Sequence, residues 1–193
     1  MADRILIYIS AAADLLAERE ALGQLISQMP TSLGWRVEQT PLDDREPNLD
    51  AVATADIHLL LLGSDVRAPV GLEWRVARRA GRSPSLFLKQ EGLRTQAGDA
   101  FARELARHSE WRRFKTLHEL RRQVAEVLVS HMAGSAERYA LLPEEIERLR
   151  AWRRAVAAAK VVAAESDSGG AGASGVILSA ERFTPSQGRL IGS

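Results

Sequence analysis

The sequence contains no cysteine, so it can form neither a disulfide framework nor a zinc site built on thiolates. It also lacks a long apolar run. The run at residues 5–9 follows Arg4 and is too short for the hydrophobic part of a secretion signal. The later run at residues 57–62 contains His58 and is far shorter than a membrane span. We therefore expect a cytoplasmic protein with no membrane partner.

The sequence also has no large excess of positive or negative charge, because it contains 26 lysines and arginines and 25 aspartates and glutamates. The basic residues are spread along predicted helices with acidic residues between them, which is typical of solvated helix faces. No RNA-binding or helix-turn-helix signature is present, so we expect no nucleic-acid partner. The histidines at positions 58, 108, 118 and 131 have no metal-ligand spacing, which argues against a metal site.

The motifs of common phosphate chemistry are also missing. No P-loop pattern occurs anywhere in the chain. After the first predicted strand, Ser10 is followed by three alanines, where a dinucleotide fingerprint would need glycines and a phosphoacceptor domain would need acidic residues. A flavodoxin-type phosphate loop would need several hydroxyl groups, and only Ser10 supplies one. All four of these site types are disfavoured.

What the sequence does contain is a regular alternation of strands and helices. Apolar runs predict strands at residues 5–9, 57–62 and 85–89. A further strand is predicted at 35–39, and an edge strand at 111–114. Helices are predicted from Asp14 to Pro30, over 49–54, over 70–80 with a cap at Gly81, and over 97–108. Short connections between such elements require right-handed crossovers. The prediction is an α/β fold: a flavodoxin-like, three-layer open parallel sheet.

The second half of the chain adds helices. Thr116 and Glu119 form a capping-box pattern that begins a helix, and residues 1–131 are predicted to be the α/β domain. Pro143 suits the first turn of a further helix, which predicts a helical extension over 135–165. Residues 166–175 have the composition of a flexible linker, and 176–193 are predicted to begin a further domain or to form a tail.

One carboxylate is placed where such a fold binds ligands. Open α/β sheets bind them beyond the carboxyl ends of the strands, and Glu73 lies one turn into the helix that follows the third strand. Helical spacing puts Glu73 on the face that packs on the sheet, so its side chain is expected to look into this cleft. The alternative is an ordinary glutamate bonded to a backbone donor or to a nearby arginine (Arg75, Arg78 or Arg79), and position alone favours that alternative.

Four segments resemble a known family. They are the strand at residues 5–10, residues 14–22 (DLLAEREAL), residues 55–63 (ADIHLLLLG), and residues 72–77 (LEWRVA) with 83–88 (SPSLFL). Together they resemble the DUF4062 domain family over residues 1–89, and more loosely to about 130. This family is similar to TIR domains and to nucleoside deoxyribosyltransferases, which share the flavodoxin-like sheet.

The resemblance implies a role for Glu73. In enzymes of both related groups a glutamate early in the corresponding helix works at the ribose of a bound nucleotide. In TIR enzymes the reaction cleaves the bond between nicotinamide and ribose in NAD, and a carboxylate stabilises or captures the oxocarbenium ion. By resemblance Glu73 is the catalytic candidate, with NAD as substrate and no cofactor. The ligand-binding candidates around it are Ser10, Asp14, Asp44, Asp65 and Trp74, of which Trp74 either stacks on the ligand or packs in the core.

Two departures bear on the choice of function. Alanines replace the family's loop hydroxyls after Ser10, and residues 67–71 lack the Ser-x-Trp-Cys pattern of NAD-cleaving TIR domains. Three hypotheses follow. The first is a TIR-like signalling or defence module that acts through self-association or binding of another protein domain. The second is an NAD N-glycosidase using Glu73, for which Glu73→Ala would abolish cleavage and leave folding nearly unchanged. The third is a domain that binds a nucleotide without chemistry.

Overall fold

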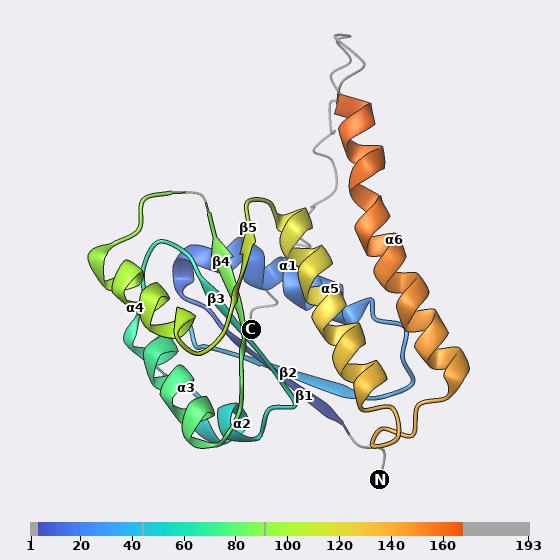
Figure 1. The fold of residues 1–193 in the computed structure, drawn as a ribbon, viewed down its shortest axis with the longest axis horizontal. Helices are drawn as coiled ribbons and strands as arrows, with labels where there is room; N and C mark the ends of the chain where they lie inside the picture. Colours follow the sequence, from blue (N-terminus) through green and yellow to red (C-terminus); the bar gives the residue numbers. More distant parts are fainter. Residues whose placement is uncertain (1–3, 44, 91, 168–193) are drawn as a thin grey trace, which may run out of the picture.

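The computed structural model describes residues 4–43, 45–90 and 92–167 (Figure 1). Five parallel strands form one sheet in the order β2-β1-β3-β4-β5. The strands are β1 (Ile5–Ser10), β2 (Trp35–Gln39), β3 (Ile57–Leu62), β4 (Ser85–Lys89) and β5 (Trp111–Phe114). This order is that of the flavodoxin-like fold, so the predicted fold class is confirmed.

Helices cover both faces of the sheet and make three layers. Figure 1 shows α2 (Leu49–Thr54), α3 (Ala68–Arg79) and α4 (Gln96–Ala106) on one side. The other side carries α1 (Leu16–Ser27) and α5 (Leu117–Gly134), and α6 (Pro143–Asp167) lies beside α5. No helix among the described residues is both long and apolar enough to cross a membrane.

Successive side chains of β1 point to opposite faces of the sheet, so they pack under different helix layers. Ile5, Ile7 and Ile9 belong to the larger core under α1 and α5. Tyr8 belongs to the smaller core under α2 and α3. Strand β3 is buried along its whole length, as expected for the centre of a parallel sheet.

Several helix boundaries differ from the predicted ones by a few residues. Asp14 does not cap α1; it lies in a 3-10 turn (Ala13–Leu15), and its carboxylate binds another loop. Helix α3 starts two residues before Val70, with a proline in its first turn, because that proline needs no helical N–H partner. Helix α4 ends at Ala106. Gly81 follows α3 with φ of +70°, the left-handed conformation predicted for its cap.

The capping box is visible in two contacts of Glu119. Its backbone N–H donates to Thr116 Oγ1 (3.2 Å), as predicted, and its carboxylate accepts from the N–H of Lys115 (2.7 Å).

Helix α6 packs back on the domain through Leu149, which is fully buried, and through Ile146 and Val156. Leu142 precedes the helix in a loop and is 60% exposed. The helix includes residues 166 and 167, the first two of the predicted linker. Residues 168–193, with the rest of that linker and the proposed further segment, lie outside the described residues.

Candidate functional site

A group of buried polar side chains lies between α3 and the sheet, where the strand order reverses between β1 and β3. Its members, called here the Glu73 cluster, are Tyr8, Ser10, Thr40, His58 and Glu73. All are at most 5% exposed, and Tyr8, Ser10 and Glu73 are fully buried. Tyr8 and Ser10 share one face of β1, and His58 pairs with Tyr8 in the register of β3. This switch point is where flavodoxin-like folds bind their ligands.

The Glu73 carboxylate accepts hydrogen bonds from three hydroxyl groups. Tyr8 Oη donates to Oε1 at 2.8 Å, and Ser10 Oγ donates to Oε2 at 2.6 Å. Thr40 Oγ1 also donates to Oε2, at 2.7 Å. Burying a carboxylate is costly unless such donors replace its water shell. The cluster is therefore built around an ionised or partly ionised Glu73.

The hydrogen-bond directions assign the state of His58. Ser10 has a single hydroxyl proton, and it donates this proton to Glu73. Ser10 Oγ therefore accepts from His58 Nε2, which lies 2.8 Å away. This assigns the neutral tautomer with its proton on Nε2. Nδ1 then carries a buried lone pair with no hydrogen-bond partner among the described residues.

Burial dominates the electrostatics of the cluster. Desolvation raises the pKa of Glu73, while the three hydroxyl donors and the positive charge of Arg19 pull that pKa back down. Desolvation, with the negative charge of Glu73, also raises the pKa of Tyr8. The pKa of His58 is lowered by burial to about 4. At neutral pH the titrating members other than Glu73 are thus uncharged.

Arg19 of α1 supplies the nearest positive charge that acts on Glu73. It is 5% exposed and donates to the carbonyl oxygens of Thr40 (2.6 Å) and Ala11 (3.4 Å). These bonds tie the ends of β1 and β2 together. Burial lowers the pKa of Arg19, and the charge of Glu73 opposes that effect.

The sequence-predicted candidates fall into separate places. Ser10 lies directly against Glu73. Trp74 faces away from Glu73, because successive helix residues turn by about 100°, and it packs with Leu60 and Leu86 under α4. The core interpretation of Trp74 is therefore the one the packing favours. Asp44 lies outside the described residues.

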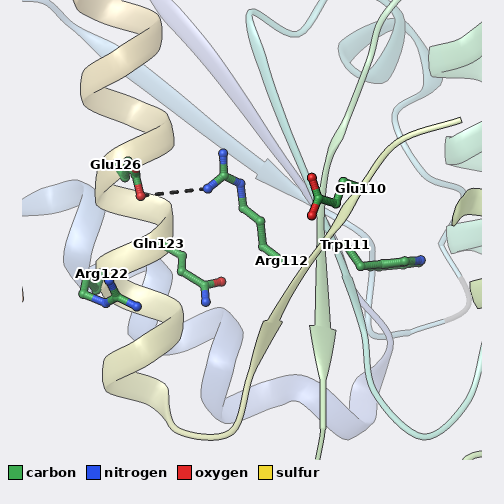
Figure 2. Close-up of a pocket in the computed structure, with 6 residues that line it drawn as sticks. All are labelled: Glu110, Trp111, Arg112, Arg122, Gln123 and Glu126. Atoms are coloured by element: carbon green, nitrogen blue, oxygen red, sulfur yellow. Dashed lines mark ion pairs between the residues drawn. The ribbon is translucent and has the colours of Figure 1, made fainter.

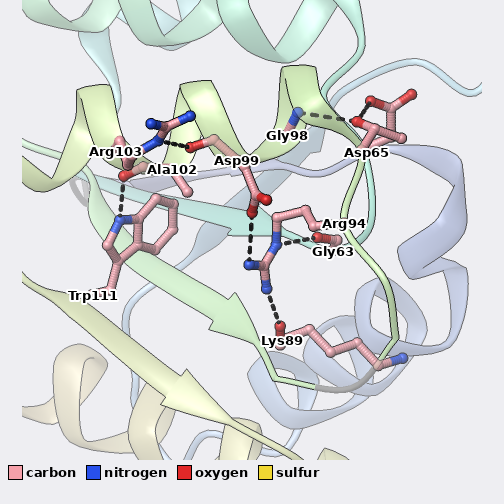
Figure 3. A network of polar contacts seen from close by, with 10 residues as sticks. Gly63, Asp65, Lys89, Arg94, Gly98, Asp99, Ala102, Arg103 and Trp111 are labelled. Atoms are coloured by element: carbon pink, nitrogen blue, oxygen red, sulfur yellow. Dashed lines mark hydrogen bonds and ion pairs between the residues drawn. The ribbon is translucent and has the colours of Figure 1, made fainter.

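Asp14 and Asp65 belong to a network of loops at the carboxyl edge of the sheet, and Figure 3 shows the part of it around Asp65 and Arg94. Asp14 accepts from the backbone N–H of Ser64 (2.8 Å) and from its hydroxyl (2.7 Å). Asp65 accepts from the Thr95 hydroxyl (2.6 Å). Arg94 holds the same loops by donating to the carbonyl oxygens of Gly63 (3.1 Å) and Lys89 (2.9 Å). Both carboxylates thus fix loop structure, and among the described residues neither forms a hydrogen bond with a member of the Glu73 cluster.

Gly63 is the tightest point of this loop network. A methyl group there would lie 2.4 Å from Asp14 Oδ2 and 3.1 Å from Leu15 Cδ2. We expect Gly63→Ala to lower the free energy of unfolding by about 1–2 kcal/mol, because Asp14 must give up Ser64. Urea denaturation measures this. Gly23→Ala is the matched control, since its methyl would meet nothing within 4 Å and α1 should gain stability. Equal stability of Gly63→Ala and the unchanged protein would contradict the expected crowding.

Sequence reasoning missed Tyr8, Thr40, His58 and Arg19. Tyr8 carried a usable signal, because the period of two places it on the same strand face as Ser10. Thr40 and Arg19 carried none, since their partners come from turns whose path a sequence does not fix. The alternative pairing of Glu73 with a neighbouring arginine is replaced by the three hydroxyl bonds.

Other features of the surface do not extend this site. Figure 2 shows a hollow beside β5 in which Arg112 pairs with Glu126 of α5 at 3.9 Å. Within the described ranges no group of three or more side chains could hold a metal ion.

Comparison with known proteins identifies no relative. No protein-family model, no curated protein and no solved structure matches this chain. Its function must therefore be argued from the site itself.

Proposed function

We propose that this chain is a non-catalytic, TIR-like assembly module of the cytoplasm that serves signalling or defence by associating with further copies of itself. The observation that carries the proposal is the state of Glu73. Its side chain is fully buried, and both carboxylate oxygens already hold hydroxyl donors.

N-glycosidase chemistry demands the opposite arrangement. A carboxylate that stabilises or captures an oxocarbenium ion must touch the ribose carbon, which requires an exposed oxygen. A ribose can reach Glu73 only if α3 lifts from the sheet and the hydroxyl bonds break. One feature favours the glycosidase hypothesis, namely the position of Glu73 at the switch point. The experiment below distinguishes this hypothesis from the assembly proposal.

Exposed leucines support an assembly surface at the carboxyl edge of the sheet. Leu16, Leu42, Leu93 and Leu117 each follow a different strand end, and they are 46%, 54%, 95% and 41% exposed. Single exposed leucines are ordinary, but four at the rim of one edge favour contact with another protein surface. The same edge holds the loop network of Asp14 and Arg94, which gives the leucines a fixed frame.

The test combines an activity assay with a measurement of mass. The purified chain is incubated with NAD at high protein concentration, and we expect no nicotinamide release. Light scattering after size exclusion is expected to show concentration-dependent dimers or larger species. Leu42→Asp with Leu93→Asp should shift this equilibrium toward the monomer by about tenfold or more. Leu142→Asp is the control, because Leu142 is about as exposed as Leu42 (60% against 54%) but lies between α5 and α6, at the opposite end of the domain.

Two outcomes would overturn the proposal. Nicotinamide release that disappears in Glu73→Gln, in a protein that remains folded, would establish the glycosidase instead. A chain that remains monomeric at every concentration would remove self-association as its mode of action.

A further inference from the structure

A second concave surface lies between α3 and α4, on the side of α3 that Trp74 faces. This surface, called here the α3–α4 hollow, has a volume of about 500 Å³. Its lining includes Val66, Arg67, Gly71, Trp74, Arg75 and Phe101. Small-molecule sites have volumes of about 300–1,000 Å³ and combine apolar walls with a few polar groups. The hollow has both the size and the composition of such a site.

The floor of the hollow is apolar and held in place. Trp74 is 6% exposed and packs with Leu60 and Leu86 of the sheet. The Arg78 guanidinium lies 5.6 Å from the centre of its ring, and the His108 ring lies 6.0 Å away. Phe101 and Val66 pack against the same cluster and are partly exposed. A ligand would therefore meet a preformed apolar surface without a large ordering cost.

The rim of the hollow is positively charged. Arg67 and Arg75 are both exposed, and neither guanidinium group makes an ion pair or a hydrogen bond with the part of the chain that the structure describes. The acidic residue of the lining, Glu104, already holds Arg107 at 2.9 Å and lies 3.5 Å from His108. Asp65 stands near Arg67, but its carboxylate accepts from Thr95 and from the N–H of Val66. Two guanidinium groups thus remain to bind an anion.

We propose that the α3–α4 hollow binds a small amphipathic anion, a molecule with an apolar or aromatic body and a carboxylate, sulfonate or phosphate group. The body lies on Trp74 and Phe101, and the anionic group binds Arg67 and Arg75. A guanidinium group can donate two parallel hydrogen bonds to two oxygens of any of these anions. This binding is independent of the assembly proposed above, because it involves none of the leucines at the carboxyl edge.

The probe is 8-anilinonaphthalene-1-sulfonate, an aromatic sulfonate whose fluorescence rises in apolar sites. We expect saturable binding at one site by the full chain. Arg67→Glu with Arg75→Glu should weaken the binding by about tenfold or more, because both cations become anions. Arg79→Glu is the matched control and should leave binding unchanged, since Arg79 is an exposed arginine of the same helix outside the hollow.

A second variant blocks the space itself. A Cβ atom at Gly71 would meet nothing within 4 Å, so this position has room to start a larger side chain. Gly71→Leu is designed to place such a side chain in the hollow, and leucine also suits a helix better than glycine. We expect it to abolish binding while urea denaturation shows a fold at least as stable. Binding that survives both Gly71→Leu and the double charge reversal would overturn the proposal, as would the absence of saturable binding. Equal affinity for the uncharged N-phenyl-1-naphthylamine would remove the role of the arginines and overturn it too.

Discussion

Glu73→Ala is expected to lower the free energy of unfolding by about 3 kcal/mol, measured by urea denaturation at pH 7. The substitution leaves three buried hydroxyl groups without their acceptor, and each unsatisfied buried donor costs about 1–3 kcal/mol. The loss stays below the full sum because His58 can change tautomer, so that its Nε2 then accepts the proton of Ser10. A charged, desolvated group is also removed, which offsets part of the cost.

Two variants separate this effect from a general loss of a carboxylate. Glu73→Gln keeps the volume and one oxygen acceptor, so we expect a smaller loss of about 1–2 kcal/mol. Glu20→Ala removes an exposed glutamate of α1 and should change stability by less than about 0.5 kcal/mol. If Glu73→Ala is as stable as Glu20→Ala, Glu73 does not hold α3 to the sheet. That result would restore the sequence-based expectation that the substitution leaves folding nearly unchanged.

The parts of the fold that the sequence predicts well are those specified by local patterns. The strands at 35–39, 57–62, 85–89 and 111–114 have the predicted bounds. For 57–62 and 85–89 the reason is an apolar run flanked by turn residues, which leaves few alternatives. Short connections then restrict the crossovers, and the parallel order follows. Gly81 was likewise predictable, since its left-handed conformation is one that glycine adopts readily.

The parts that the sequence does not predict depend on distant partners. Asp14 has the residue type of a helix cap, yet it binds Ser64, which is fifty positions away along the chain. The cap interpretation was wrong because a loop from a neighbouring strand offers two donors at once. Residue type and spacing predict only contacts between residues that are within one or two helical turns of each other in the sequence.

The Glu73 cluster illustrates the same limit at the site. Helical spacing correctly places Glu73 against the sheet. It does not predict that three hydroxyl groups bind the carboxylate there. Tyr8 and Thr40 reach it across 65 and 33 positions of sequence. A carboxylate predicted to face an open cleft is therefore closed in by side chains from two strand ends, which changes the function that the site best supports.

His58 makes the stability of the domain depend on pH. Its pKa is about 4 in the folded protein, against about 6.5 when exposed, because burial disfavours the charged ring. The unfolded chain therefore binds a proton below pH 6.5 that the folded chain does not bind. The contribution of His58 is present in full above that pH and is lost as the pH falls toward 4. From pH 7 to pH 5 the loss amounts to about 2 kcal/mol.

The comparison with His58→Gln isolates this effect. The glutamine amide can still donate to Ser10 Oγ but does not titrate. Glu73 contributes with the opposite sign, because its raised pKa makes its burial less costly as the pH falls, and it does so in both proteins. We expect the difference in unfolding free energy between the two proteins to shrink by about 2 kcal/mol from pH 7 to pH 5. Parallel stability curves, or an imidazole NMR signal of His58 that titrates near pH 6.5, would show that His58 is charged inside the fold. The neutral tautomer assigned from Ser10 would then be wrong.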